Sequence, residues 1–149
     1  MSSLTTATTS VVDEQIEELV GTIPEFQGRV FVGKVPDGED IPTNERGMVM
    51  PYVVVIFGGL IQTRTNRRGI VGARGNLKHH PFTAFVTGAT DRQARHLCDR
   101  VRDVIEGVEF EGTGEIAEDT SGNTAYPGNA TLKPTRYSYM MTFSLLIGA

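Results

Sequence analysis

Apolar residues recur at helical spacing near the start of the chain, and acidic residues fill the positions between them. One face of a helix there would carry Val12, Ile16, Leu19, Val20 and Ile23. Ser10 stands before this pattern and is expected to cap the helix, and Pro24 ends it. The pattern therefore predicts an amphipathic helix over residues 10–23.

Three stretches further along have the composition of β-strands. Residues 29–35 are mostly apolar and end at a proline. Residues 51–57 are almost continuously apolar, as expected for a strand covered on both faces. Two glycines follow, and they suit a bend or bulge through which this strand continues into residues 60–63. Residues 81–87 alternate and predict a third strand.

Residues 90–105 carry the clearest local signal in the chain. Thr90 followed by Gln93 has the spacing of a capping box, and Gly107 stands where a helix commonly ends in a left-handed glycine. The apolar stripe consists of Ala94, Leu97, Cys98, Val101, Val104 and Ile105. This pattern predicts a second helix that lies on a sheet.

Residues 135–147 close the chain with a long strand pattern that is rich in aromatic and long apolar residues. At roughly 3.3 Å per residue such a strand would be about 40 Å long. A typical strand has about 5–6 residues. A strand of this length either crosses the whole sheet or serves a neighbouring subunit, so it points to assembly rather than to chemistry.

The expected order is helix, strand, strand, strand, helix, strand, with two long loops at residues 37–47 and 111–134. Both loops are rich in turn-forming residues and have no periodicity. Two helices packed on a mixed or antiparallel sheet make an α+β fold. At 149 residues we expect one domain over residues 1–149, with residues 1–9 flexible.

Composition limits the compartment and the class of protein. No apolar run approaches the roughly 18 residues needed to cross a membrane. The Ser/Thr-rich start lacks the charged and apolar blocks of a signal peptide. The single cysteine, Cys98, cannot form an internal disulfide, so a reducing compartment is compatible with the chain.

The net charge of −4 hides a basic middle between acidic flanks. Residues 47–90 carry five basic side chains and no acidic one: Arg64, Arg67, Arg68, Arg74 and Lys78. This cluster has three interpretations: a solvated hairpin tip, a surface that docks on an acidic subunit or partner, or a contact with nucleic acid phosphates. No aromatic residue lies between positions 58 and 81, so base stacking has no support.

The other reactive residues do not form a site. His79 and His80 are adjacent and would point to opposite faces of a strand, and His96 lies off the apolar stripe of its helix. Cys98 falls on that stripe and reads as a core thiol. The glycine-rich stretch at residues 69–75 lacks the lysine and following helix of a phosphate-binding loop. We therefore expect no catalytic residue, no metal site and no cofactor.

The segments described above occur in an order that resembles a known family. A helix leads into residues 29–36, and a polar loop leads into residues 51–57. A strand–helix unit passes from residues 82–87 through Thr90 into the second helix, and residues 136–147 close the domain. This organisation resembles that of the tail terminator (tail completion) proteins of long-tailed bacteriophages. The insertion around residues 60–78 is long for that pattern.

The resemblance implies a structural protein rather than an enzyme. Members of that family form hexameric rings that cap the tail tube, end its polymerisation and join tail to head. The implied partners are further copies of the chain, the major tail tube protein, the head–tail connector protein and the DNA that passes through the ring lumen, with no membrane. The implied location is the head-proximal end of the virion tail, after assembly in the host cytoplasm.

Two other classes of function stay open on the sequence. The first is a nucleic-acid-binding module that uses the basic segment Arg64–Lys78, whose affinity would fall steeply with salt. The second is a small enzyme or ligand carrier, which would need polar residues that converge in an apolar pocket. The sequence nominates no such residues.

Overall fold

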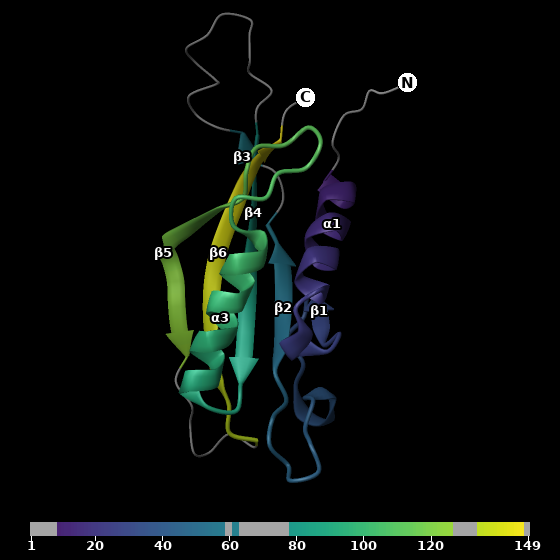
Figure 1. Ribbon diagram of the computed structural model, residues 1–149, viewed down its shortest axis with the longest axis vertical. Helices are drawn as coiled ribbons and strands as arrows, with labels where there is room; N and C mark the ends of the chain where they lie inside the picture. Colours follow the sequence, from purple (N-terminus) through teal and green to yellow (C-terminus); the bar gives the residue numbers. More distant parts are fainter. Residues whose placement is uncertain (1–8, 59–60, 63–77, 127–133, 148–149) are drawn as a thin grey trace, which may run out of the picture.

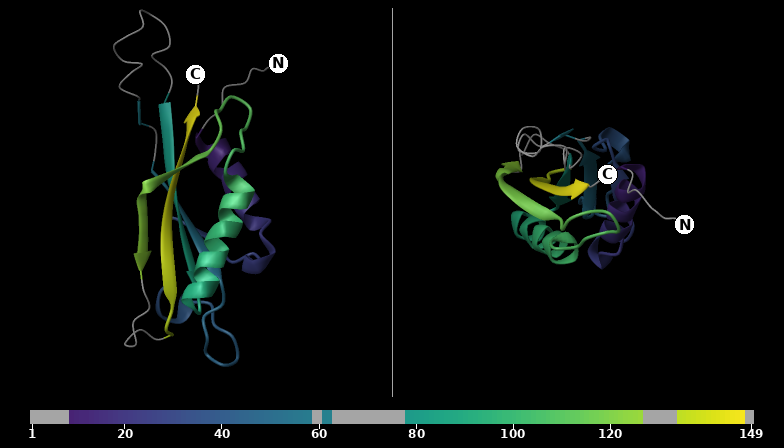
Figure 2. Two further views of the ribbon diagram at one scale, coloured as in Figure 1. Left: turned by 60° about the vertical axis from the view of Figure 1, so that its left-hand side comes forward. Right: turned by 90° about the horizontal axis from the view of Figure 1, so that it is seen from above.

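One β-sheet carries two helices on the same face, as Figure 1 and the view from above in Figure 2 show. The computed structural model describes residues 9–58, 61–62, 78–126 and 134–147. Its helices are α1 (Thr9–Gly21), α3 (Asp91–Ile105) and two short 3₁₀ turns, η1 (Pro24–Phe26) and η2 (Gly38–Asp40). Its strands are β1 (Val30–Val32), β2 (Tyr52–Phe57), β3 (Ile61–Gln62), β4 (Lys78–Gly88), β5 (Ala117–Tyr126) and β6 (Tyr137–Ile147).

The strands follow the order β1-β2-β4-β6-β5, and the short β3 pairs with β4 beyond the end of β2. β1 runs parallel to β2, and every other pair is antiparallel. The predicted α+β class with a mixed sheet is therefore confirmed. β4 and β6 pair along their whole length, from Lys78 opposite Ile147 to Gly88 opposite Tyr137. The long closing strand thus pairs along the full length of the central strand β4, which agrees with the first of the two alternatives that its sequence left open.

The main core lies between this sheet and the two helices. Val12, Ile16 and Val20 of α1 are buried there, and so are Leu97 and Val101 of α3. The sheet contributes alternate residues of β2, β4 and β6 to the same cluster: Val53, Val55, Phe82, Ala84, Val86, Met141, Phe143, Leu145 and Ile147. The apolar stripes of both helices were therefore phased correctly from sequence.

The opposite face of the sheet has no α-helix on it among the described residues. A second, smaller apolar cluster lies there: Ile41, Val49, Tyr52 and Val54. Ile41 comes from residues 37–47, which the sequence predicted to be a polar loop, and Val49 lies two residues beyond that loop. The loop prediction is confirmed in outline, but these two side chains attach the segment to the sheet.

The helix ends match the sequence in one case and not in the other. The Thr90 side chain accepts a hydrogen bond from the Gln93 backbone N–H at 3.1 Å, so the predicted cap of α3 is confirmed. The Gln93 side chain in turn accepts from the Ala89 N–H at 2.8 Å, one residue before the position that a capping box uses. Ser10 lies inside α1, which begins at Thr9, so the prediction that Ser10 is the cap was wrong.

Residues 111–134 were predicted to form one long loop, and this prediction was wrong. Ala117–Tyr126 forms β5, which pairs with β6 at the edge of the sheet. Its sequence, AEDTSGNTAY, has no apolar alternation because an edge strand with one neighbour can be polar on much of its surface. Its register shifts between Asp119 and Thr124, which breaks the pattern further.

The bend predicted after residue 57 is present. Gly58 donates its N–H to the Pro81 carbonyl at 2.9 Å, and Ile61 and Gln62 then pair with His79 and Lys78. A Cβ atom on Gly58 would come within 3.0 Å of the Pro81 ring. The close approach of the two backbones therefore requires a glycine at this position.

Candidate functional site

The basic segment that the sequence singled out falls mainly outside the described residues. Arg64, Arg67, Arg68 and Arg74 all lie there. Lys78 is described and is the first residue of β4, where it stands between Gln62 of β3 and Ile147 of β6. Residues 63–77 therefore connect two strand ends that lie next to each other.

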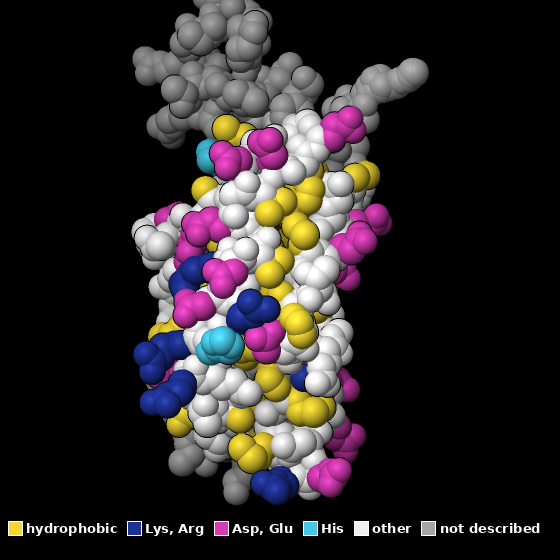
Figure 3. Space-filling model, viewed as in Figure 1, with side chains coloured by type: hydrophobic (Ala, Val, Ile, Leu, Met, Phe, Trp, Pro, Cys, Tyr) yellow, Lys and Arg dark blue, Asp and Glu magenta, His cyan; other side chains and the backbone are white. Residues whose placement is uncertain are grey.

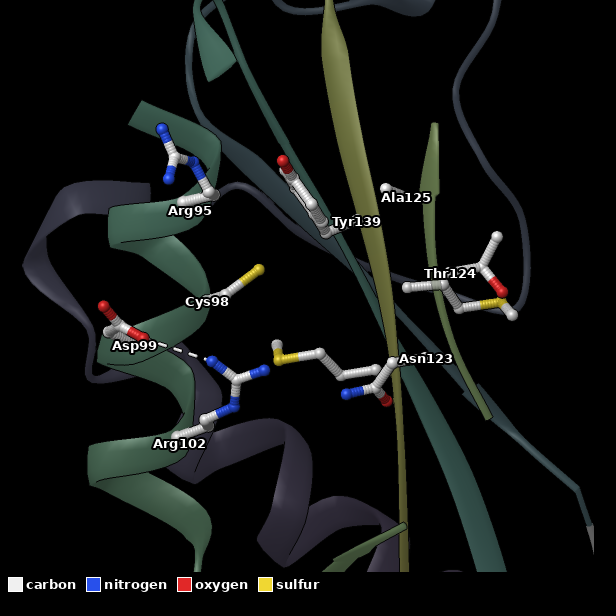
Figure 4. Close-up of a pocket in the computed structure, with 10 residues that line it drawn as sticks. Arg95, Cys98, Asp99, Arg102, Asn123, Thr124, Ala125 and Tyr139 are labelled. Atoms are coloured by element: carbon white, nitrogen blue, oxygen red, sulfur yellow. Dashed lines mark hydrogen bonds and ion pairs between the residues drawn. The ribbon is translucent and has the colours of Figure 1, made fainter. Parts of the chain in front are cut away.

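A groove of about 450 Å³ opens between α3 and the β5 edge of the sheet (Figure 4). Arg95, Cys98, Asp99 and Arg102 line one wall from α3, as Figure 4 shows. The other wall comes from β5 and β6 and consists of Asn123, Thr124, Ala125, Tyr139, Met140 and Met141. The groove thus carries guanidinium and carboxylate groups on its α3 wall and a mixture of polar and apolar side chains on its β5 and β6 wall.

A hydrogen-bonded network fixes the width of this groove. Arg102 donates from Nε to Glu118 Oε1 at 2.8 Å, and Asn123 donates from Nδ2 to Glu118 Oε2 at 2.7 Å. Asn123 Oδ1 also accepts from the Thr142 backbone N–H at 3.1 Å, so the network joins α3, β5 and β6. Only 6% of the Glu118 side chain is exposed. Burial alone would raise the pKa of Glu118, but the hydrogen bonds from Arg102 and Asn123 outweigh it and lower that pKa.

No sequence pattern singled out Glu118 and Asn123, because both lie in the segment that was predicted to be a loop. The spacing Glu118-x-x-x-x-Asn123 becomes meaningful only once the register shift in β5 is known. Several exposed acidic residues could equally have been chosen as the partner of Arg102. This part of the groove was therefore missed.

The groove contains two groups that could act as nucleophiles, the Cys98 thiol and the Tyr139 hydroxyl, and both favour their protonated form. Burial is the main cause that raises the pKa of the Cys98 thiol to about 11, so the thiolate is scarce near neutral pH. The Tyr139 hydroxyl donates a hydrogen bond to Asp91, and this hydrogen bond raises the pKa of Tyr139. The prediction that Cys98 is a core thiol is confirmed, since its residue is 4% exposed. Neither group is therefore activated as a nucleophile.

A second groove, of about 410 Å³, runs along the other edge of the sheet between α1 and β1. Glu14, Glu17 and Glu18 line it from α1, and Gly21, Gly28 and Val30 complete it. The three carboxylates are paired with no cation among the residues that the structure describes. This groove therefore presents unbalanced negative charge next to a strand edge.

The three histidines occupy three different environments. His80 is buried on the face of the sheet that carries the two helices. Its Nε2 lies 2.5 Å from Asp13 Oδ1 of α1, and its ring stacks on Phe57. His79 is exposed on the opposite face, as the sequence predicted for adjacent residues of a strand. His96 is exposed on α3, 3.5 Å from Glu25. Within the described ranges, no group of His, Cys, Asp and Glu side chains has the geometry to hold a metal ion.

The candidate surfaces have to be argued from the structure itself. The chain matches no family model, and no curated protein matches it in sequence. Among the helices that the structure describes, none has both the length and the apolar character to cross a membrane. The two grooves at the sheet edges, together with the basic segment between β3 and β4, are therefore the candidate functional surfaces.

Proposed function

We propose that this chain is a structural protein of a bacteriophage tail, which forms a ring that caps the tail tube, ends its polymerisation and joins the tail to the head. The ring would be a homohexamer at the head-proximal end of the tail. The tail tube protein would bind one face of the ring and the head–tail connector the other, and DNA would pass through its lumen. In this proposal the chain acts by shape and contact, and it is not an enzyme.

One observation carries the proposal: a rigid sheet with long central strands has a free edge on each side. β4 and β6 pair over 11 residues, so the centre of the sheet resists bending. β1 and β5 have one strand neighbour each in the described part of the chain. A free edge is a ready surface for a further chain, and proteins that stay monomeric usually block it. The α+β order, with two helices on one face, also agrees with the resemblance described above.

The second candidate function is nucleic acid binding through the basic segment. The observation in its favour is the charge of residues 47–90, which carry five basic and no acidic side chains. Against it stands the absence of aromatic residues between positions 58 and 81. The two functions also differ in their expected response to salt, because phosphate contacts weaken steeply as salt rises.

The decisive experiment is polymerisation of the tail tube protein of the same phage with and without this chain. We expect tubes of limited length with a ring of this chain at one end, visible by negative-stain electron microscopy. A chain that is monomeric alone does not contradict the proposal if it forms the ring at the tube end. Tubes that grow equally long with and without the chain, and that carry no chain at their ends, would overturn it.

A further inference from the structure

β5 covers one edge of β6 but contributes little to the apolar core. Its two alanines, Ala117 and Ala125, are exposed, and no apolar side chain of residues 117–125 is buried. Figure 1 shows β5 at the left margin of the sheet, where β6 is its one strand neighbour in the described part of the chain. An element with few buried apolar contacts opens at a lower free energy than the core beside it. Burial therefore does little to hold β5 in place.

The backbone ladder between β5 and β6 is also interrupted. Residues 117–119 pair with β6, and residues 124–126 pair with it again after a shift of register. Within the interruption Asp119 Oδ1 accepts hydrogen bonds from the Ser121 N–H at 3.1 Å and from the Ser121 hydroxyl at 2.6 Å, so part of this segment bonds to itself. On its other side β6 pairs with β4 over 11 residues without a shift. The ladder to β5 is thus the weaker of the two ladders on β6.

The polar network around Glu118 is what attaches β5 to the helix layer. Arg102 Nε donates to Glu118 at 2.8 Å, and Asn123 Nδ2 donates to it at 2.7 Å. Asn123 Oδ1 in turn accepts from the Thr142 backbone N–H at 3.1 Å. Charged side chains of both signs gather over α3 beside this margin, as Figure 3 shows. Arg102 also donates to Asp99 at 3.1 Å, so it keeps a partner on its own helix when Glu118 moves into water. The network can therefore break without leaving a buried charge unpaired.

The point at which β5 joins the core is well defined. Ile116, the residue before β5, is 1% exposed and belongs to the main core. Its N–H donates to the Val108 carbonyl and its carbonyl accepts from the Gly107 N–H, both at 2.8 Å. Ile116 therefore stays fixed while the chain beyond it can move, which makes Ala117 the hinge at which β5 would turn away from the sheet.

Release of β5 would change the character of the sheet edge. β6, Tyr137–Ile147, contains no charged residue and no proline. Without β5 it would present a long row of unpaired backbone N–H and C=O groups between mostly apolar side chains, the kind of edge that pairs with a further strand. β5 itself is polar and interrupted, and both features protect an edge from such pairing. The sheet thus has two alternative edges on this side, and the position of β5 decides which one it presents.

From these observations we propose that β5 is a releasable cover of the β6 edge. It opens as a unit beyond Ile116 while both helices and the other strands stay folded. The contacts of Glu118 with Arg102 and Asn123 set how often it opens. This conformational device does not depend on the proposed function, because it follows from burial, strand pairing and hydrogen bonds within one chain.

The single cysteine provides a native probe of this opening. Cys98 is 4% exposed and lines the α3 wall of the groove, across from Asn123, Thr124 and Ala125 of β5 (Figure 4). A thiol reagent should therefore reach Cys98 when β5 opens. The reference probe is Val53→Cys in a Cys98→Ser background, because Val53 is fully buried in the main core and becomes accessible when the whole fold opens. With each rate divided by that of the same thiol in urea, we expect Cys98 to react about tenfold or more faster than the reference thiol.

Two variants separate the opening of β5 from the opening of the whole fold. Glu118→Gln removes the charged acceptor of Arg102 and should speed the modification of Cys98 by about tenfold. Ile16→Val weakens the core under α1, which stays folded when β5 opens. It should therefore speed the reference thiol several-fold and leave the Cys98 rate unchanged. Glu17→Gln changes an exposed acid of α1 and is the control, which should change neither rate.

Amide hydrogen exchange of the unmodified chain gives a second readout that needs no variant. We expect residues 117–125 to exchange faster than β4 and α3, because β5 opens without them. If Glu118→Gln does not fold, Asn123→Ala tests the same network, since it removes the second donor to Glu118.

Three results would overturn the inference. The first is an equal rate for Cys98 and the reference thiol, and the second is an equal acceleration of both by Ile16→Val. The third is slow exchange of residues 117–125 beside a fast Cys98, which would mean that α3 opens instead of β5. None of these measurements involves tail assembly, so the inference and the proposed function stand or fall separately.

Discussion

At the scale of single residues, Glu118 shows how much one buried carboxylate can organise. It receives hydrogen bonds from Arg102 of α3 and Asn123 of β5, and its side chain is almost fully buried. Without these partners a buried carboxylate would be strongly destabilising. The polar strand β5 therefore attaches to the helix layer through charge and hydrogen bonds, since its sequence offers few apolar side chains.

The first prediction is that Glu118→Gln destabilises the fold by about 1–3 kcal/mol near neutral pH, because one charged acceptor for Arg102 is lost. The folded-state pKa of Glu118 is lowered. Its contribution is therefore complete above the unfolded-state pKa of about 4.3 and is lost as the pH falls through the lower, folded-state pKa. Urea midpoints of the two proteins should differ at pH 7 and converge towards pH 3. An equal difference at both pH values would contradict this account.

Val101 gives the corresponding test for the apolar layer. Its side chain is fully buried between α3 and the sheet. We predict that Val101→Asp costs roughly 3 kcal/mol or more, since it buries a charge with no partner. Asp103→Ala, two residues on and exposed on the same helix, is the control and should change stability by under about 0.5 kcal/mol. Similar losses in both variants, by denaturant titration, would mean that α3 presents a different face to the sheet.

At the scale of elements, the sequence predicted those whose burial is periodic and missed the one that is not. Helices α1 and α3 and the strands β4 and β6 bury helically spaced or alternate apolar residues, and β2 buries the continuous apolar run Tyr52–Val55, so their patterns were visible. β4 begins three residues before its predicted start because His80 is buried through its partner Asp13, which no local pattern reveals. β5 was missed because Glu118 and Asn123 hold it through long-range partners.

The candidate surfaces could likewise be predicted from the sequence only in part. The acids of α1 were visible in sequence as a polar helix face, but the groove beside β1 depends on which strand lies at the edge. Arg95 looked like an ordinary solvated residue, because its place in the groove depends on β5, a strand that the sequence did not predict. Sequence could show the charges, while only the order of the strands could show which of them lie beside an edge of the sheet.

Gly122 gives the element-scale prediction, since it marks where β5 leaves its regular register. A Cβ atom there would lie 2.7 Å from Thr142 Oγ1 and 3.1 Å from Thr142 Cβ. We predict that Gly122→Ala costs about 1–3 kcal/mol, because either strand must shift. The loss should be smaller in a Thr142→Ala background, which removes the nearer atom. Gly21→Ala in α1 meets no atom within 4 Å and should be neutral or slightly stabilising. A loss at Gly21 equal to that at Gly122 would refute the steric explanation.

At the scale of the whole molecule, the edges of the sheet and the ends of its strands can serve different contacts. β1 and β5 lie at opposite edges of the sheet, and each has one strand neighbour in the described part of the chain, so these edges are where copies could meet side by side. Lys78 and Gln62 lie at one end of the strands, and residues 63–77 connect them. In a ring whose axis follows the strands, this end belongs to one face of the ring. The basic segment would therefore meet an axial partner, or DNA, rather than the neighbouring copy.

The last prediction follows from this division and uses Arg67→Glu with Arg68→Glu. Both residues lie outside the described part of the chain, in the stretch without acids between Glu45 and Asp91. The variant should fold and should form side-by-side contacts normally, because surface charge changes usually cost within about 0.5 kcal/mol. Its binding to the tube end or the connector should weaken, since reversed charges oppose encounter with an acidic partner. Arg67→Lys with Arg68→Lys keeps the charge and is the control. Normal tail assembly by the reversed variant would mean that the cluster is only a solvated turn. If the variant assembles normally but no longer binds duplex DNA, the nucleic-acid function is favoured, because phosphate contacts depend on these charges.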